Sequence, residues 1–310
     1  PGWLINMNFN DCETYPDTCE EIRALLQNQD FRIGLSHALD RERLIDVAWG
    51  GIGEPTNATI SPQAWHFASS EGQAVYEEWK NAYVAYDPEL AMQHFDAAGF
   101  VDADDDGFRD LPSGAPFTLV LDQGDWGGQE IPILSNESYV GDLTDVGIDV
   151  LLKDLMGQPD WGLRQNEGLY MLRNMHASEL DIWTYPDWIF PLRNNRSWPM
   201  EGRYRETGGD EGWEPMPGTT YAYELQAIYD EGLATADIDA RHQLVWDAIA
   251  IHVEHGPFMI GGSGDQQMPV VVKDGFYGIP DLVILGPWAP GSPGNLNPEQ
   301  FWMDASLRGE

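Results

Sequence analysis

The sequence has 310 residues, of which 42% are apolar and 12% aromatic, so the chain can bury a large core and is not a disordered protein. Its 52 acidic residues outnumber 16 basic ones and give a formal net charge of −36 at pH 7. This charge repels nucleic acids and anionic membranes, both of which bind through basic patches, and no run approaches the roughly 18 apolar residues of a membrane-spanning helix.

The acidic charge has two interpretations. It is typical of a strongly solvated surface in high salt, where counterions screen the self-repulsion, and it also suits a cationic partner. In neither case do we expect nucleic acid as a partner.

The chain starts at Pro1 without a basic and apolar leader and opens inside an apolar strand predicted over 4–10. We therefore expect a fragment or a processed product, with any signal peptide outside it. Cys12 and Cys19 follow in the polar stretch DCETYPDTCEE. Their spacing permits a disulfide, which fits an oxidising compartment; two free thiols or a metal site are the alternatives.

Two helices are predicted next, each with a recognisable end. Apolar residues recur at helical spacing over 30–50, and the helix stops at Gly50. The second helix has Asp87 as its N-cap, Pro88 as its first residue and Gly99 as its end.

Between these helices and the next strand lies an acidic turn, DADDDGFRD, with the spacing of a calcium-binding loop. The candidate ligands at loop positions 1, 3, 5 and 9 are Asp102, Asp104, Asp106 and Asp110. Position 12 is Ser113 rather than a bidentate Glu, so we expect weak affinity. The alternative is a solvated acidic turn that binds no cation.

The middle of the chain predicts alternating strands and helices, which indicates parallel strands with crossover helices. The predicted order is strand 116–122, helix to about 145, strand 148–155, helix 161–175 and strand 180–185. An irregular stretch over 186–217 is long enough to suggest a functional role. The rest is predicted as helices 221–233 and 238–254, strands 257–262 and 269–274, and a tail rich in Gly and Pro.

Four segments in order resemble the bacterial extracellular solute-binding proteins of family 5. They are FRIGLSHALDRERLIDVAWGGIGEP; YDPELAMQHFDAAGFVDADDDGFRDLPSGAPFTLVL; VGIDVLLKDL; and GGSGDQQMPVVVKDGFYGIPD with NPEQFWMD. The resemblance implies an α/β, periplasmic-binding-protein-like fold of two lobes that close on a ligand. This chain would supply a nearly complete second lobe (31–265) and parts of the first lobe (1–30 and, on the chain's return, 266–310).

The resemblance also implies a function and partners. We expect the substrate-binding component of an ABC importer, periplasmic or extracellular, that needs no cofactor apart from the candidate calcium. Its partners would be a small-molecule ligand, an ABC permease and the missing N-terminal half of the same protein, whose absent N-terminus is a candidate lipid anchor.

In the family, the segment around the predicted strand 180–185 faces the ligand cleft. The residues that we expect to contact ligand are Trp183, Tyr185, Asp187, Trp188, Trp198 and, after an earlier strand, Trp126. Trp platforms surrounded by amides and carboxylates suit a sugar, whereas a peptide needs a charge for each terminus. Packing in the core is the alternative for each Trp.

The spacing around Trp183 departs from the peptide-binding pattern. In oligopeptide receptors of the family, an Asp three residues after this Trp binds the peptide's amino terminus, but here that position is Pro186 and Asp187 comes one place late. An ammonium buried without that partner is costly. We therefore favour an oligosaccharide over a peptide or another small solute. A carbohydrate hydrolase is the rival from another class, but no catalytic motif supports it.

Overall fold

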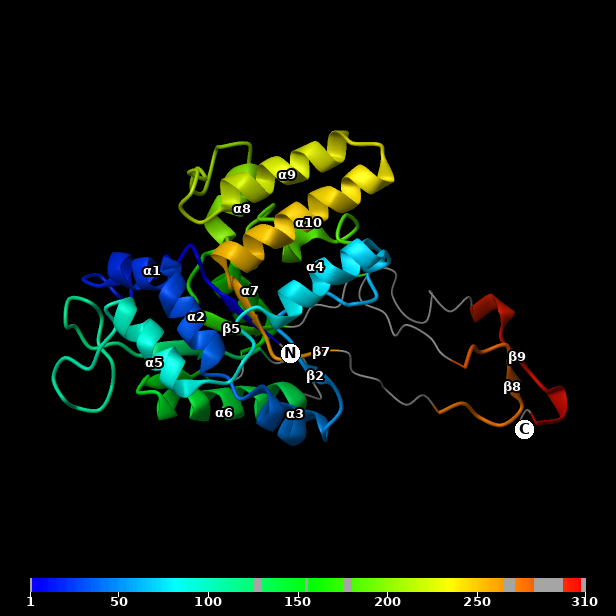
Figure 1. Cartoon of the computed structure of the whole chain (residues 1–310), viewed down its shortest axis with the longest axis horizontal. Helices are drawn as coiled ribbons and strands as arrows, with labels where there is room; N and C mark the ends of the chain where they lie inside the picture. The colour runs from blue at the N-terminus through cyan, green and yellow to red at the C-terminus, as the bar shows by residue number, and fades with distance from the viewer. Residues whose placement is uncertain are drawn as a thin grey trace.

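A five-stranded mixed sheet lies at the centre of the structure, between two layers of helices (Figure 1). The computed structural model describes residues 2–124, 130–153, 156–175, 180–264, 271–281 and 298–307. The strand order is β4-β3-β5-β1-β6. Their bounds are β1 Gly2–Ile5, β3 Leu119–Asp122, β4 Val150–Leu152, β5 Leu172–Met175 and β6 Met259–Gly261. Strands β3, β4 and β5 are parallel, and β1 runs antiparallel to both β5 and β6.

The predicted parallel order of strands and helices is confirmed, but its last strand was predicted in the wrong place. α6 (Glu130–Asp145) connects β3 to β4, and α7 (Gln158–Asn166) connects β4 to β5. Residues 180–185 form a turn, whereas β5 lies in the segment predicted as the end of helix 161–175. Gly168, with a φ of +68°, ends the helix early, and a short apolar run cannot be assigned to strand or helix by periodicity alone.

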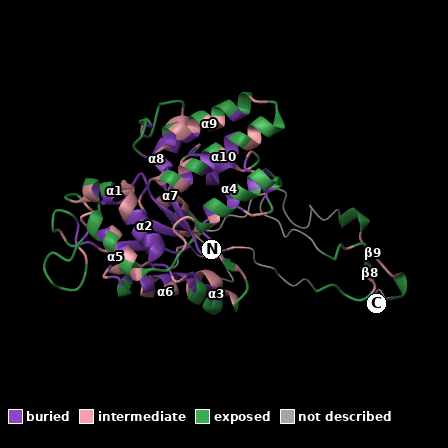
Figure 2. Cartoon of the chain, viewed as in Figure 1, coloured by how far each residue is buried: buried purple, intermediate pink, exposed green. Residues whose placement is uncertain are grey.

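Strand β1 shows how the sheet separates two cores. Trp3 and Ile5 point into a first core, and Leu4 between them points into a second, as the two-residue period of a strand requires. The helices of the first core are α1 Cys19–Gln27, α2 Gln29–His37, α3 Arg41–Trp49, α5 Pro88–Ala97 and α6. Those of the second are α4 Ser70–Asn81, α9 Ala222–Ala234 and α10 Ile238–His255. Buried residues follow the sheet and the inner helix faces (Figure 2).

The residues at which helices begin and end were predicted more accurately than the number of helices between them. The helix predicted over 30–50 is two helices, α2 and α3, because Asp40 starts a new one by accepting a hydrogen bond from the Arg43 amide. Gly50 ends α3 with a φ of +61°, as predicted. The Asp87 side chain caps α5 through the Leu90 amide, which confirms that boundary.

The C-terminal half contains both confirmed and unpredicted elements. Helices α9 and α10 and strand β6 are confirmed, and α8 (Pro199–Glu206) lies inside the stretch predicted as irregular. The strand predicted over 269–274 is wrong for 271–274, and its first two residues lie outside the described ranges. Two small sheets complete the structure: β2 (Glu54–Pro55) with β7 (Ser263–Gly264), and β8 (Phe276–Tyr277) with β9 (Trp302–Met303).

The structure does not divide at residue 30. Strand β1, from the segment expected in lobe one, pairs with β5 and β6, which belong to the segment expected in lobe two. An apolar strand that is buried on both faces is most stable between two neighbours. Residues on both sides of the expected boundary therefore share one sheet.

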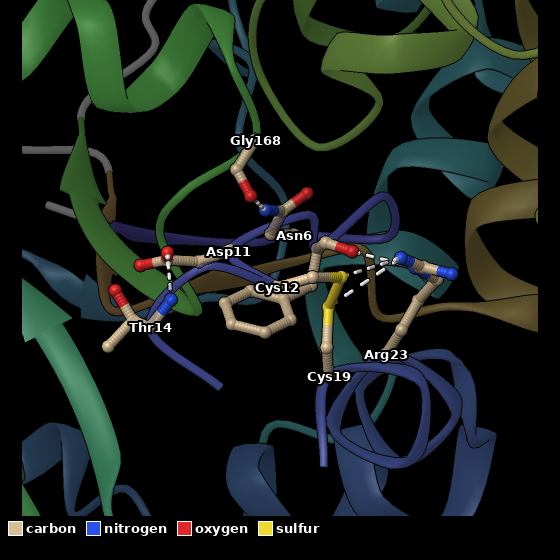
Figure 3. Close-up of a disulfide and its surroundings, with 8 residues drawn as sticks. Asn6, Asp11, Cys12, Thr14, Cys19, Arg23 and Gly168 are labelled. Carbon is tan, nitrogen blue, oxygen red and sulfur yellow. Dashed lines mark hydrogen bonds between the residues drawn. A yellow bond between two sulfur atoms is a disulfide. The ribbon is translucent and has the colours of Figure 1, made fainter. Parts of the chain in front are cut away.

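A disulfide joins Cys12 and Cys19 at the start of α1, which confirms the predicted pair (Figure 3). Arg23 lies beside it and donates from Nε to the Phe9 carbonyl at 2.7 Å, with Nη2 3.8 Å from both sulfur atoms. Asn6, in the same view, donates from Nδ2 to the Gly168 carbonyl at 2.9 Å and so ties the loop after β1 to the end of α7.

Candidate ligand-binding site

The carboxyl ends of strands β3, β5 and β6 lie at one edge of the sheet. The antiparallel β1 starts at that edge, since Gly2 pairs with both Met175 and Gly261. The N-terminus lies there beside β2 and β7 (Figure 1). In open α/β sheets, this is the edge at which ligands bind.

A cavity of about 50 Å³ opens at this edge. It is lined by Gly2, Trp3, Leu4, Ala58, Thr59, Met175, Trp188, Met259, Gly261 and Ser263. None of these lining residues is charged. Since complete ligand pockets measure roughly 300–1,000 Å³, this cavity is suited to a small neutral part of a larger ligand.

Two polar groups on the lining residues have no hydrogen-bond partner among the described residues. They are the indole Nε1 of Trp188 and the hydroxyl of Thr59, and both atoms are buried. A buried polar group left unpaired costs about 1–3 kcal/mol. A ligand hydroxyl can accept from the indole N–H and exchange a hydrogen bond with the threonine hydroxyl, which removes this cost.

The segment after the turn at 180–185 positions Trp188. Pro186 and Asp187 begin a short 3₁₀ helix, η2 (Pro186–Trp188), which buries Trp188 to 2% exposure. The Arg196 guanidinium stacks on the Trp188 ring at 3.7 Å and donates to the Tyr185 hydroxyl at 3.2 Å. Burial lowers the pKa of Arg196. Arg196 therefore holds the Trp188 ring in place, while the indole N–H has no partner in the part of the chain that the structure describes.

Asp187 is fully buried next to this stack. One oxygen, Oδ2, pairs with Arg193 Nε at 2.9 Å and accepts from Asn195 Nδ2 at 3.3 Å. The other oxygen, Oδ1, has no partner among the described residues. The carboxylate charge is thus balanced by the protein, but one acceptor position is open.

A buried arginine on β5 was missed by the sequence analysis. Arg173 stacks on the Trp161 ring at 3.6 Å, and none of its guanidinium nitrogens has a hydrogen-bond partner among the described residues. Burial lowers its pKa to about 9. It faces the second core, as its register partner Leu4 does. An arginine inside the apolar run LYMLRNM was the available sequence signal.

Two of the predicted tryptophans lie elsewhere. Trp183 is half-buried and packs with Phe190 and Tyr229, at centroid distances of 5.7 and 6.0 Å. Trp198 is in the second core, 1% exposed, and donates to the Thr220 carbonyl at 3.0 Å. The expectation that Trp198 faces ligand therefore does not fit its position. Trp126 lies outside the described residues.

The acidic turn brings part of the predicted calcium set together. Carboxylate oxygens of the exposed Asp102, Asp104 and Asp106 lie within 4.8 Å of one another. Asp110 is buried, and its Oδ2 accepts from the Ala103 amide at 3.0 Å. Three of the four residues thus form a compact group, and calcium binding stays a prediction.

Comparisons with known proteins agree with this architecture. The structure is similar to the oligopeptide-binding protein OppA, with a TM-score of 0.72 at 23% identity, covering 98% of this chain and 46% of that chain. It is similar to the periplasmic binding protein MelB of Agrobacterium fabrum C58, solved with stachyose, with a TM-score of 0.70 at 17% identity, covering 100% and 44%.

Sequence comparison gives relatives of the same kind. The chain is 26% identical over 259 residues to a periplasmic alpha-galactoside-binding protein of Rhizobium meliloti (strain 1021), covering 79% of this chain and 34% of the relative. This chain therefore spans less than half the length of each of these three proteins. Among the described residues, no helix is both long and apolar enough to cross a membrane.

The family itself follows from a direct match. Residues 2–195 match the family described as bacterial extracellular solute-binding proteins, family 5, middle part. The match covers more than half of the chain, and it includes β1, the capped helix α5 and strands β3, β4 and β5. The chain belongs to the bacterial extracellular solute-binding proteins of family 5.

Proposed function

We propose that this protein captures an oligosaccharide and delivers it to an ABC permease. The observation on which this rests is the cavity at the carboxyl edge, where the lining residues include Trp188 and no charged side chain. A neutral sugar offers hydroxyl groups to unpaired donors and apolar ring faces to aromatic side chains, and it needs no counter-charge.

The unpaired groups support this ligand class. The Trp188 indole N–H and the Thr59 hydroxyl are neutral, and hydroxyl groups can satisfy both. Two relatives point the same way by their names: the alpha-galactoside-binding protein and MelB in complex with stachyose.

An oligopeptide is the second candidate, and one observation favours it. The unpartnered Oδ1 of Asp187 can accept a hydrogen bond from a peptide ammonium, and OppA is among the similar structures. The Arg193 side chain, however, already neutralises this carboxylate. A second positive charge would therefore gain less from Asp187 than from a free carboxylate.

The complete receptor requires parts beyond those described. We propose that residues 2–264 form the second lobe, that 266–310 return to the first, and that an N-terminal segment supplies the rest of the first lobe. The ligand would then bind between two lobes in the periplasm or outside the cell, with a lipid anchor as one way of keeping the receptor near its permease.

Thermal-shift measurements on the protein at its full natural length test the ligand class. Stachyose at about 100 times its dissociation constant should stabilise the protein by about 2.7 kcal/mol. Asp187→Asn separates the candidates, because it should weaken peptide binding and leave stachyose binding unchanged. Stabilisation by oligopeptides but not by oligosaccharides, lost in Asp187→Asn, would overturn the proposal.

A further inference from the structure

A buried histidine joins three segments behind the ligand-binding edge. His66, 1% exposed, lies in the short helix η1 (Trp65–Phe67). Its backbone carbonyl accepts from Trp246 Nε1 of α10 at 2.9 Å, and the neighbouring Trp65 amide donates to the Leu180 carbonyl at 3.2 Å. The histidine thus lies where η1, α10 and the turn at 180–185 meet.

The protonation state of His66 follows from its neighbours. Its Nε2 lies 3.1 Å from the Ile182 amide nitrogen and 3.1 Å from the Trp65 indole nitrogen, and both groups can only donate. Nε2 must therefore carry a lone pair, and the imidazole proton is on Nδ1. That proton is donated to Nδ1 of His242, 2.8 Å away, so both histidines are neutral.

This arrangement places one unfavourable contact beside the favourable ones. Asp181 Oδ1 lies 3.2 Å from the same Nε2, so two acceptors face each other without a proton between them. A proton added at Nε2 is donated to Asp181, and the positive charge is shared across the two Nδ1 atoms. The Ile182 amide then loses its acceptor, whereas the Trp65 indole loses the bond to Nε2 and keeps Asp181 as an acceptor.

The groups that face the pair are few. Asp181 comes from the turn, and Asp239 and Arg241 flank His242 on α10. Glu71, in the first turn of the adjoining α4, is exposed. Burial and the neighbouring His66 lower the pKa of His242. Burial raises the pKa of Asp181, but hydrogen bonds from the Thr184 hydroxyl and the Trp183 amide help to hold that pKa below its usual range.

We propose that His66 is a positioning residue for the segment 180–188, and that one proton added to the His66–His242 pair releases Ile182 and weakens ligand binding at acidic pH. The Asp181 carboxylate organises this segment by accepting from the Trp183 amide at 3.0 Å and from the Thr184 hydroxyl at 2.7 Å. Trp188 lies at the end of the segment. The effect on ligand rests on the proposed function, whereas the effect on the segment does not.

Amide spectra of the protein between about pH 7.5 and pH 5 test the link without ligand, across the usual range of histidine. We expect the Ile182 amide and the Trp65 indole signals to shift together with one midpoint. His66→Gln keeps an acceptor near the Nε2 position but does not titrate, so both signals should stay constant. His242→Asn keeps an acceptor for His66 Nδ1 but cannot share the charge, so the midpoint should move to lower pH.

The matched control is His94→Asn, which removes a histidine that pairs with Asp30 in the other helix layer. It should titrate as the unmodified protein does. No shift of Ile182 and Trp65 in the unmodified protein, or an unchanged midpoint in His242→Asn, would overturn the proposal even if His66→Gln failed to fold.

The effect on ligand binding is tested with stachyose as the ligand. Loss of one hydrogen bond should raise its dissociation constant about three- to tenfold between about pH 7.5 and pH 5.5, and His66→Gln should remove this dependence. An affinity equal at both pH values would refute the effect on binding. If stachyose binds at neither pH while Ile182 and Trp65 still titrate together, the proposed ligand is wrong and the positioning role of His66 stands.

Discussion

Replacing Thr59 by Val should change stability and ligand binding in opposite directions. The Thr59 hydroxyl is buried beside the cavity and has no partner among the described residues. Valine has nearly the same shape without the hydroxyl. Since an unpaired buried polar group costs about 1–3 kcal/mol, its removal should stabilise the ligand-free protein by about 1 kcal/mol. If the hydroxyl bonds a sugar, the same change should raise the stachyose dissociation constant about three- to tenfold.

Thr56 in the same loop provides a matched control. Its hydroxyl accepts from the Ala58 amide at 3.0 Å, so Thr56→Val leaves that amide unpaired and should destabilise the protein by about 1 kcal/mol. Each kilocalorie should move the melting temperature by about 2–4 °C. Melting curves with and without stachyose measure both effects. A Thr59→Val protein that melts lower without ligand, as Thr56→Val should, would refute the assignment of an unpaired hydroxyl.

Four further predictions address the rest of the chain. Burial raises the pKa of Glu201 from 4.5 to about 7, so the folded state binds this proton more tightly than the unfolded state does. The free energy of unfolding should therefore fall by about 3 kcal/mol as pH rises from about 4.5 to 7. Denaturant unfolding measures this dependence, and Glu201→Gln should lack it. A Cβ at Gly232 would clash with the Trp183 ring, so Gly232→Ala should lower the melting temperature. Gly141, on α6, has open space around it, so Gly141→Ala should increase the free energy of unfolding by up to about 1 kcal/mol. Equal effects of the two substitutions on the melting temperature would contradict this packing. Raising the salt concentration from about 0.02 to about 0.5 M should raise the melting temperature by screening the charge of −36, and a flat profile would contradict self-repulsion. Calcium should bind the acidic turn with a dissociation constant of about 0.1–1 mM, seen by calorimetry, and Asp104→Asn should abolish the signal; no heat at about 10 mM would exclude the site.

Sequence alone was sufficient where the determining interactions are local. The Asp87 cap and the Gly50 stop depend on a few neighbouring residues, and both are where the pattern placed them. The disulfide likewise joins two residues of one short loop. Such features can be predicted because the groups that form them are close in the chain.

Features that depend on distant parts of the chain were not predictable in the same way. Strand β5 was assigned to a helix because its pairing with β1 and β3 is not visible in its own residues. Trp188 and Trp198 both lie in the second core, yet Trp188 also lines the cavity and Trp198 does not. The partner of His66 is on a helix 176 residues away. Burial and pairing of this kind are decided by tertiary packing.

The central position of β1 has a consequence for how the protein is made. Trp3 is far in sequence from its neighbours in the sheet, which are Asn174 and Ile260. The backbone groups of β1 can therefore pair with both β5 and β6 only after these later strands have been synthesised. Contacts so distant in sequence slow folding, and an unpaired apolar strand is prone to aggregate meanwhile. We expect a chaperone that binds β1 in the nascent chain to increase the yield of folded protein.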